Sequence, residues 1–474
     1  MNSIEKINSN YPESKVGIIL QKKENQKLLQ YITKDAFGAH LFPGNLKGYG
    51  NQKFVEDMSE DIKKGNPIHL WLNLPFCKYK CNYCQFPVYI MKGTSLAGFI
   101  EIDEWINLIK EEIRLWKKAI PALGDVPIGE VNLFGGTPTQ LQDEYIRRLV
   151  VYLYEEFNIT EETTMRIEGS PDSLSYNKLH FLRELGFQKL SFGIQTFDEE
   201  VLKLAGRLHT SEQVIDVVKN AHELGFIDVS GDLIYGLPGQ TVTGFLEDVK
   251  RMIDLMFDTI VITKLHLRNF GETRTAISGE KPAAWEKEKV RAKISNQGYH
   301  WPELGEIYQM REQAVKILRK SGYFESPTMY FNRRNSEVQK WKALVVNQDK
   351  QFPELGIGLG ASSCNYKSEC NNCISKEEYI SQIRQGVLPI SIINGFSSEE
   401  RKKRSIRMAL TSCKPVYDSI FQQKFRESLL DNEKYPFFER LEKRGLLLVD
   451  KTDGVIQLTP EGQTLVEAII NCEI

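Results

Sequence analysis

Three cysteines lie close together in this sequence, as Cys77, Cys81 and Cys84 in a C-x3-C-x2-C array. The spacing is too tight for a disulfide framework and leaves one cysteine odd, whereas it suits three thiolates that bind one iron–sulfur cluster. A four-iron cluster with three protein thiolates has one iron without a protein ligand. That iron can bind a substrate or cofactor, as the open position of a catalytic zinc site does. The array therefore predicts a metal-binding, catalytic 4Fe–4S centre.

Chance and a zinc site both account less well for the array. With 8 cysteines in 474 residues, chance would give roughly 0.002 such arrays. A three-cysteine zinc site would need a fourth His or Cys nearby, and the following segment, Gln85–Gly98, contains neither. The cluster remains the better interpretation.

Composition and charge narrow the function classes. The chain is 41% hydrophobic and 26% charged, as is usual for a globular protein. A net charge of −2 gives no overall attraction to nucleic acid or to an anionic membrane. The polar N-terminus has no apolar signal core, and no apolar run approaches the roughly 18 residues of a membrane span. We therefore expect a cytoplasmic protein, in which thiols stay reduced and can bind metal.

The elements that must position the cysteines form a regular pattern from residue 69 onward. Short apolar runs alternate with amphipathic helical stretches, which predicts a parallel α/β sheet, open or curled into a partial barrel. The runs are His69–Pro75, Glu130–Gly136, Met165–Ser170, Lys189–Gln195, Ile227–Tyr235 and Thr259–Leu267, and the helical patterns cover 97–118, 142–157, 175–185, 211–224 and 242–256.

Several polar or glycine-rich positions share one place in this pattern. In parallel α/β folds the chemistry lies at the C-terminal ends of the strands. The cysteine array follows the first strand, so these positions predict a single site. They are Gly135-Gly136-Thr137 after the second strand, Glu168 and Gln195 at the ends of the third and fourth, and Asp232 on the fifth.

The remaining sequence is less regular. The glycine-rich stretch Gly356–Ser363 could cradle a phosphate or a ligand, although a close-packed loop is the more common meaning of such a stretch. The pattern of residues 397–470 predicts a separate small helical unit. Its helix at 437–444, strand at 446–449, turn and second strand at 455–458 indicate a winged-helix-like arrangement.

The order and spacing of several motifs in the chain resemble those of the radical S-adenosylmethionine (SAM) enzymes. The chain is specifically similar to the family of the oxygen-independent coproporphyrinogen III dehydrogenase and its relatives. The order and spacing of the motifs fit from about residue 69 to 268, and the unit from Glu399 to Gly462 resembles the family's C-terminal domain. The matching motifs are Leu74–Cys77, Phe134–Thr139, Ile167–Asp172, Leu190–Phe197, Gly206–His209 and Gly231–Gln240.

This resemblance implies a fold, cofactors and a set of site residues. The expected fold is a partial (β/α)6 radical SAM barrel with a C-terminal helical, winged-helix-like domain. The three cysteines bind the cluster, SAM chelates the open iron, and one electron cleaves SAM to methionine and a 5′-deoxyadenosyl radical. The implied SAM contacts are Gly135, Gly136, Glu168 and Arg207 at the methionine end, Gln195 and Asp232 at the ribose, Tyr83 at the adenine, Thr137 near a second SAM, and Trp71 at the family's aromatic position.

The sequence departs from the family pattern at two positions. Phe86 stands where the coproporphyrinogen dehydrogenases typically carry another cysteine, and Asn73 stands where the pattern often has His. These departures favour the paralogues over the porphyrinogen enzyme. We therefore expect an enzyme that uses a second SAM to methylate or cyclopropanate an unsaturated small-molecule substrate. The alternatives are coproporphyrinogen decarboxylation, haem degradation and a haem chaperone.

The expected domains are an N-terminal extension at 1–66, a barrel core at 67–270, a barrel-completing, substrate-covering region at 271–395 and a C-terminal domain at 396–474. The expected partners are a small-molecule substrate and a one-electron donor such as flavodoxin or ferredoxin. An RNA substrate, suggested by the winged-helix-like unit and the basic run Arg401–Arg404, is disfavoured by the charge of −2.

Two further groups of residues each allow two interpretations. Cys364, Cys370 and Cys373 could form a second metal site, because Cys370-x2-Cys373 has ligand-like spacing, but free thiols in a variable loop are the favoured interpretation. The aromatic and basic cluster Tyr330–Arg334 could contact a carboxylated or phosphorylated substrate, or equally form a solvated loop.

Overall fold

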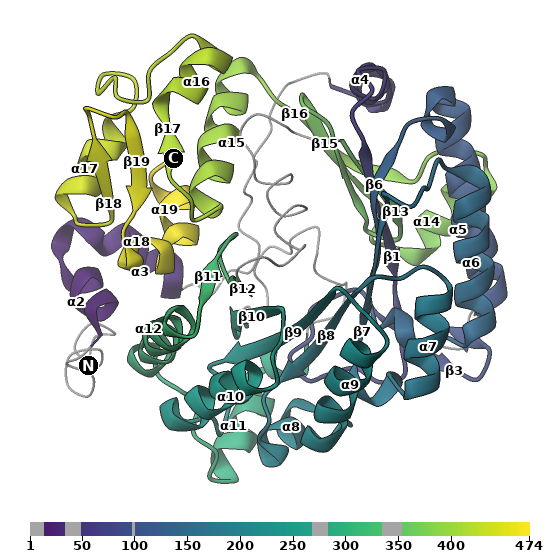
Figure 1. The fold of residues 1–474 in the computed structure, drawn as a ribbon, viewed down its shortest axis with the longest axis horizontal. Coiled ribbons are helices and arrows are strands. Elements are labelled where there is room, and N and C mark those ends of the chain that lie inside the picture. Colours follow the sequence, from purple (N-terminus) through teal and green to yellow (C-terminus); the bar gives the residue numbers. More distant parts are fainter. Residues whose placement is uncertain (1–13, 34–48, 97–99, 268–282, 334–352) are drawn as a thin grey trace.

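A curved sheet forms the body of the protein (Figure 1). The computed structural model describes residues 14–33, 49–96, 100–267, 283–333 and 353–474. In these ranges the sheet has twelve strands, in the order β11-β12-β10-β9-β8-β7-β6-β1-β13-β14-β15-β16. The predicted parallel α/β core is confirmed by its central strands. They are β1 (Ile68–Leu74), β6 (Ile128–Gly135), β7 (Thr164–Gly169), β8 (Lys189–Gln195), β9 (Asp228–Tyr235) and β10 (Thr259–Lys264).

The two faces of this sheet differ in polarity because side chains alternate along each strand. One face carries apolar residues such as Leu70, Leu133 and Ile167, which share a core with the covering helices. The opposite face carries buried polar residues, including Glu130 and Lys189. Figure 1 shows the helices outside the curve of the sheet. They are α5 (Ile102–Ala119), α6 (Asp143–Glu156), α7 (Tyr176–Glu184), α8 (Glu199–Ala205), α9 (Ser211–Glu223) and α10 (Val242–Asp254).

A seventh parallel strand, β13 (Glu354–Gly358), pairs with β1 and contains the start of the glycine-rich stretch. A Cβ on Gly356 would lie 2.2 Å from the Ser362 carbonyl oxygen, and one on Gly358 would lie 2.4 Å from the Asn73 carbonyl oxygen. The glycines therefore permit close backbone packing, in a strand and hairpin rather than a loop. The antiparallel strands β14 (Ser362–Cys364), β15 (Ser368–Asn372) and β16 (Ile390–Gly395) continue this edge, and α14 (Lys376–Arg384) lies between the last two.

The other edge of the sheet is an antiparallel hairpin. Its strands are β11 (Tyr323–Glu325) and β12 (Tyr330–Arg333), and β12 pairs with β10. Arg334, the last residue of the predicted aromatic and basic cluster, lies outside the described residues, while Tyr330–Arg333 form a strand instead of a loop. The helices α11 (Glu288–Asn296) and α12 (Leu304–Lys320) precede this hairpin.

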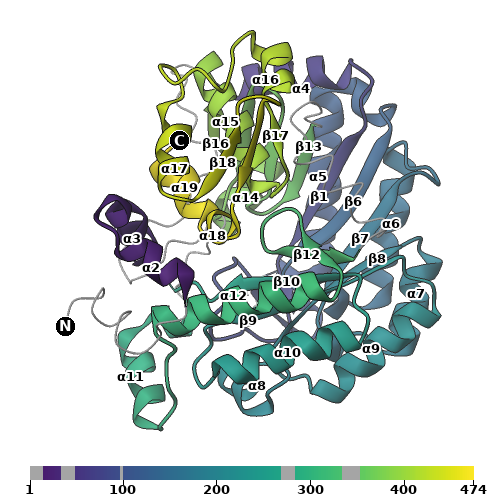
Figure 2. The ribbon, with the colours of Figure 1, turned by 60° about the vertical axis from the view of Figure 1, so that its left-hand side comes forward.

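The C-terminal residues form a second core, as expected for a separate helical unit. It includes a three-stranded sheet in the order β17-β19-β18. Two N-terminal helices, α2 (Lys15–Gln21) and α3 (Gln26–Thr33), share this core (Figure 2), whereas α4 (Asn51–Ile62) packs into the barrel core. The domain boundaries remain a prediction. The C-terminal elements are α15 (Ser398–Thr411), β17 (Val416–Tyr417), α16 (Asp418–Phe425), α17 (Pro436–Lys443), β18 (Leu447–Asp450), β19 (Val455–Leu458), α18 (Pro460–Thr464) and α19 (Val466–Cys472).

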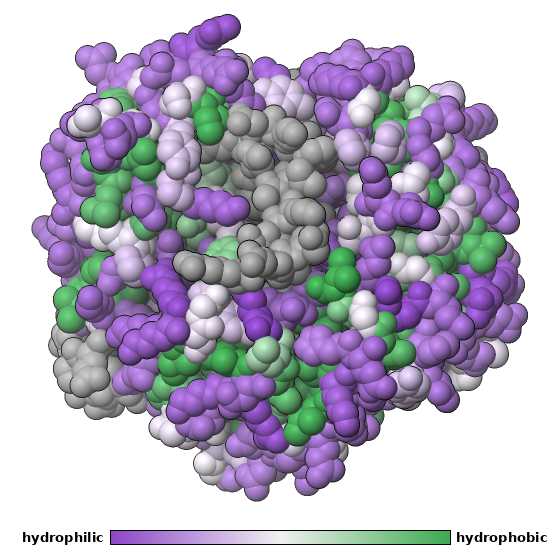
Figure 3. Space-filling view, in the orientation of Figure 1, coloured by the Kyte–Doolittle hydropathy of each residue, from purple (hydrophilic) through white to green (hydrophobic). Residues whose placement is uncertain are grey.

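The described surface in the view of Figure 3 is largely hydrophilic, and its apolar residues lie in separate groups. Among the described residues, none of the helices combines the length and the apolar character needed to cross a membrane.

Candidate active site

The cysteine loop leaves the sheet directly after β1. Cys77 ends the short strand β2 (Phe76–Cys77), which pairs with β3 (Tyr89–Lys92) on the far side of the loop. Cys77 is buried, and Cys81 and Cys84 are partly buried. The Cys84 N–H donates to the Cys81 carbonyl at 3.2 Å. The loop is thus folded as a compact turn that presents three thiols.

Asn82 anchors this loop to the end of α8. Its backbone N–H donates to the Ala205 carbonyl at 2.9 Å, and its Nδ2 donates to the Leu204 carbonyl at 2.8 Å. The next residue after the helix, Gly206, has a φ of 71°, a left-handed helix cap that favours glycine. The chain reversal at Gly206 brings Arg207 against the cysteine loop.

Two polar side chains contact the cysteines. Cys77 Sγ lies 3.5 Å from Thr137 Oγ1, and Arg207 Nη1 donates to Cys81 Sγ at 3.5 Å. Burial raises the pKa of Cys77 to about 12 and that of Cys84 to about 11, and the neighbouring cysteines add to both shifts. Iron binding must therefore displace protons from these thiols, as metal binding to cysteine does. The mutual influence of the three sulfurs and the cation beside them fit a shared, negatively charged cluster.

Among the residues that the structure describes, no three His, Cys, Asp or Glu side chains are grouped so as to hold a single metal ion. This includes Cys364, Cys370 and Cys373, the candidates for a second metal site. Cys370 and Cys373 are buried in the barrel core, and Cys364 and Cys370 lie on β14 and β15 rather than in a loop.

The glycine turn after β6 is tied to the strand that carries Cys77. The Gly136 N–H donates to the Leu74 carbonyl at 2.8 Å, and the Thr137 N–H donates to the Phe76 carbonyl at 2.6 Å. A Cβ on Gly136 would lie 2.4 Å from the same Phe76 oxygen. Only glycine permits this approach, so the turn sets the position of Cys77.

Glu168 lies near the end of β7, and Arg207 follows the cap of α8. Burial raises the pKa of Glu168, and a backbone hydrogen bond from Gly135 acts in the opposite direction. Arg207 Nη2 donates to Ser170 Oγ at 2.8 Å and to the Gly193 carbonyl at 2.7 Å. Burial would lower the pKa of Arg207, but Tyr83 and Cys81 hold it above its ordinary value. The site thus offers one carboxyl group and one permanent cation beside the cysteines.

Gln195 and Asp232 lie on the next two strands. Gln195 is buried and has a φ of 71°, which is rare for a residue other than glycine. The pairing of β8 with β9 shifts register between Gly193 and Gln195, and Gly193 is the partner of Asp232. Such irregular positions at a strand end are typical of functional sites.

Aromatic side chains lie on the cysteine loop and on β1. The Tyr83 ring lies 6.0 Å from the Trp285 ring, and the Trp285 backbone N–H donates to the Asn82 carbonyl at 2.9 Å. Trp71 packs edge-on against Phe134, with ring centroids 5.4 Å apart. The sequence pattern had no signal for Trp285, because it lies about 200 residues from the array.

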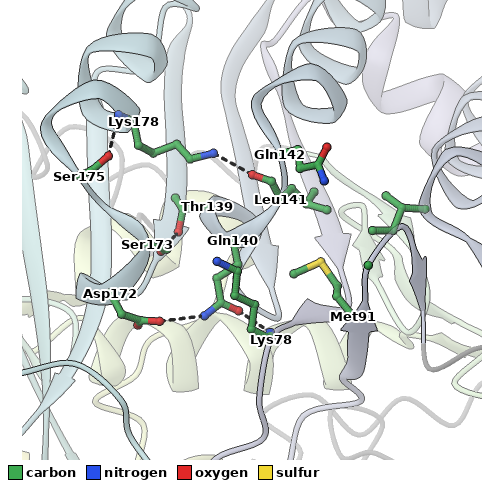
Figure 4. A pocket seen from close by; sticks show the side chains of 12 residues that line it. Lys78, Met91, Thr139, Gln140, Leu141, Gln142, Asp172, Ser173, Ser175 and Lys178 are labelled. Atoms are coloured by element: carbon green, nitrogen blue, oxygen red, sulfur yellow. Dashed lines mark hydrogen bonds between the residues drawn. The ribbon is translucent and has the colours of Figure 1, made fainter.

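A cavity of about 450 Å³ opens beside the loop, between Lys78 and Lys178 (Figure 4). Gln140 Oε1 accepts from the Lys78 backbone N–H at 2.6 Å, and Gln140 Nε2 donates to Asp172 Oδ2 at 3.4 Å. Gln140 therefore links the residue after Cys77 to the turn after β7. Sequence reasoning did not identify this link.

Asn73, at the family's His position, forms a hydrogen bond within the protein. Its Nδ2 donates to the Leu359 carbonyl at 2.6 Å, and its side chain is buried. Among the predicted strand residues, Glu168, Gln195 and Asp232 lie at one end of the sheet, whereas Trp71 lies lower on β1, in register with Asn132 on β6. Asn73 links β1 to the turn after β13.

Comparison with known proteins agrees with this geometry. Residues 74–255 match the family described as the Radical SAM superfamily. The chain is 25% identical over 401 residues to a heme chaperone of Bacillus subtilis, in a match that covers 83% of this chain and 96% of that protein. It is 24% identical over 440 residues to the oxygen-independent coproporphyrinogen III oxidase of Escherichia coli, in a match that covers 90% and 88%.

A solved structure of coproporphyrinogen III oxidase from Escherichia coli has the same fold. The TM-score is 0.76 at 23% identity, and the match covers 94% of this chain and 98% of that one. Residues 74–255 are a radical SAM domain, so a 4Fe–4S cluster and SAM are the cofactors that the family implies. Residues 74–255 therefore carry the radical SAM domain, in a chain that is similar over most of its length to an oxygen-independent coproporphyrinogen III oxidase and to a heme chaperone.

Proposed function

We propose that this radical SAM enzyme acts on a tetrapyrrole, by oxidative decarboxylation of coproporphyrinogen III or by haem degradation. The observation that carries the proposal is the extent of the similarity. It continues beyond residues 74–255 and covers 90% of the chain in the match to the coproporphyrinogen III oxidase of Escherichia coli. The fold match likewise covers 94% of the chain. A shared radical SAM domain alone would give a much shorter match.

The residues at the strand ends suit this role. Cys77, Cys81 and Cys84 would hold the cluster, which when bound supplies the electron that cleaves SAM. Glu168 can accept from the SAM amino group, and Arg207 can donate to its carboxylate. We also assign the remaining predicted contacts to SAM, because most of them follow or end the strands on either side of the cysteine loop. They are Gly135 and Gly136 at the methionine end, Gln195 and Asp232 at the ribose, Tyr83 at the adenine, Trp71 at the family's aromatic position, and Thr137 near a second SAM.

The proposed reaction needs redox partners. Conversion of one propionate side chain to a vinyl group releases one CO2, one hydrogen atom and one electron, so an electron acceptor is required. SAM cleavage requires an external one-electron donor, for which we propose a flavodoxin or a ferredoxin. The exposed Lys78 follows Cys77 directly, which gives such an acidic donor a cationic contact close to the cluster.

A second candidate is methylation or cyclopropanation of an unsaturated small molecule with a second SAM as the carbon source. Asn73 and Phe86 favour it. Asn73 replaces a His and is hydrogen-bonded to Leu359, so it offers a substrate no titratable group. Phe86 is 37% exposed on the cysteine loop, where the porphyrinogen enzymes typically carry a further cysteine.

One experiment separates these functions. The cluster is reconstituted without oxygen, and the enzyme is incubated with reductant and methyl-labelled SAM, with coproporphyrinogen III, with haem or with neither. We expect 5′-deoxyadenosine and methionine to form together with a decarboxylated or ring-opened tetrapyrrole. Joint release of S-adenosylhomocysteine and 5′-deoxyadenosine with label in a substrate would instead support methyl transfer. Stoichiometric haem binding without any product would support a chaperone. Cys77→Ala is the inactive control.

A further inference from the structure

A buried group of charged and polar residues continues from the strand ends toward the middle of the sheet. Asp232 on β9 is the register partner of Val261 on β10, and Val261 is the partner of Tyr330 on β12. Directly paired residues point to the same face of a sheet. Tyr330 and Asp232 therefore lie on one face, two strands apart, with Val261 of β10 between them.

Arg166 lies on the same side of β7 as Glu168, because residues two apart share a face. Arg166 is 5% exposed. The charges of Asp228 and Glu130 act most strongly on its guanidinium and raise its pKa against burial, and Glu168 and Tyr330 act in the same direction. The Tyr330 phenol in turn interacts with Arg166, Asp232 and Glu168. Tyr330 thus lies within electrostatic reach of carboxyl groups on two different strands and of one guanidinium.

The strand between these carboxyl groups, β8, carries Gln195 over this part of the face. Gly193 on β8 is the register partner of Asp232, and Ser191 is that of Glu168. A Cβ on Gly193 would lie 2.2 Å from Gln195 Nε2. The Gln195 amide group therefore occupies the space above Gly193, beside Asp232.

The charge balance gives Arg166 a specific task. On β6 to β9 this face carries the carboxyl groups of Glu130, Asp228, Glu168 and Asp232, and the cations on these four described strands that share the face are Arg166 and Lys189. Lys189 Nζ lies 3.5 Å from Glu130 Oε2 and is paired there. Burial raises the pKa of Glu168, against Arg166 and the Gly135 backbone. Burial also raises the pKa of Tyr330 to about 12, so its phenol is neutral and able to donate.

We infer that Arg166 and Tyr330 complete the SAM site, with Arg166 as the positioning residue for the Glu168 carboxylate and Tyr330 as the hydroxyl donor between Glu168 and Asp232. Tyr330 comes from β12, outside the matched domain at 74–255. The hairpin that follows α12 would therefore contribute directly to cofactor binding. The inference rests on the proposed role of Glu168 in binding the SAM amino group.

The test measures SAM binding rather than turnover. Reconstituted Arg166→Met, Arg166→Lys and Tyr330→Phe are titrated with SAM in anaerobic equilibrium dialysis between pH 5.5 and 8.5. The SAM-induced change in the electron paramagnetic resonance signal of the reduced cluster is recorded in parallel. Without the cation, the pKa of Glu168 rises further, so SAM binding by Arg166→Met should weaken about tenfold at pH 7. The midpoint of the pH dependence of SAM binding by this variant should rise by about 1–3 pH units. Arg166→Lys should restore both.

Tyr330→Phe should weaken SAM binding several-fold and alter the resonance signal. Tyr323→Phe is the matched control, because the buried Tyr323 hydroxyl on the neighbouring strand donates to the Phe257 carbonyl at 2.6 Å. This variant loses a structural hydrogen bond and should bind SAM like the wild type. If Arg166→Met does not fold, Tyr330→Phe still decides whether β12 contributes to SAM binding.

Glu168→Gln separates failure of this inference from failure of the proposed site. If Glu168→Gln binds SAM as tightly as the wild type, the assigned role of Glu168 is wrong. If Glu168→Gln loses SAM while Arg166→Met and Tyr330→Phe keep wild-type affinity and pH dependence, the inference alone is overturned.

Discussion

The most specific structural prediction concerns Gly136. In Gly136→Ala the new Cβ would lie 2.4 Å from the Phe76 carbonyl oxygen, 2.7 Å from its nitrogen and 2.9 Å from its carbonyl carbon. All three are backbone atoms, so no side-chain rotation can relieve the contact. Normal carbon contacts are about 3.5 Å or longer, which requires a backbone shift of roughly 1 Å. Such overpacking costs about 1–3 kcal/mol.

The same shift pulls on the hydrogen bond from the Thr137 N–H to the Phe76 carbonyl, which is 2.6 Å long and whose loss adds about 0.5–1.5 kcal/mol. Because Phe76 precedes Cys77, the displaced strand moves a cluster ligand. We expect Gly136→Ala to lose about 2–4 kcal/mol of unfolding free energy and most of its cluster. The assays are urea unfolding and iron per chain after anaerobic reconstitution. Gly244→Ala, in α10, is the control, since its Cβ meets only the Thr241 hydroxyl, at 3.2 Å. Wild-type iron content and stability in Gly136→Ala would refute the reasoning.

Three further predictions test the buried groups. Burial raises the pKa of Glu112 to about 7 from 4.5, so this carboxyl adds stability below pH 4.5 that is lost as the pH rises through 7. The free energy of unfolding of the wild type in urea should fall by up to about 3 kcal/mol between pH 4.5 and pH 7, and Glu112→Gln should lack this fall. The same fall in the variant would contradict this. Arg311→Met leaves the buried Glu325 carboxylate without its cation and should cost about 3–5 kcal/mol. Adding Glu325→Leu should recover much of that cost, and equal stability of the single and double variants would argue against it. Cys370→Ala combined with Cys373→Ala should leave iron per chain unchanged, whereas a loss of iron would reveal a second metal site.

Much of the parallel sheet was predictable because its signal is local. Each expected strand begins or ends within a few residues of the observed one, since apolar runs and amphipathic helices alternate within short windows. The cysteine array was predictable for the same reason, because its three ligands lie within eight residues. Position at the C-terminal ends of the strands then brought Glu168, Gln195 and Asp232 into the same neighbourhood.

What the sequence did not reveal depends on contacts between distant segments. The strand β13 reaches β1 across about 280 residues, and glycines that resembled a loop serve its close packing against Asn73. Tyr330 was assigned with equal weight to a loop or a substrate contact, because nothing in its own segment shows that β12 pairs with β10. Likewise, α2 joins a core formed more than 350 residues later. Pairing partners of this kind are set by tertiary packing rather than by local periodicity.

The central claim is that Cys77, Cys81 and Cys84 hold a 4Fe–4S cluster on which SAM is cleaved. The most direct measurement is iron per chain and 5′-deoxyadenosine formed after anaerobic reconstitution and reduction, in the wild type and in each single Cys→Ala variant. We predict about four irons per chain and 5′-deoxyadenosine in the wild type, and loss of both in every variant. Wild-type 5′-deoxyadenosine formation in any of the three variants would contradict the claim.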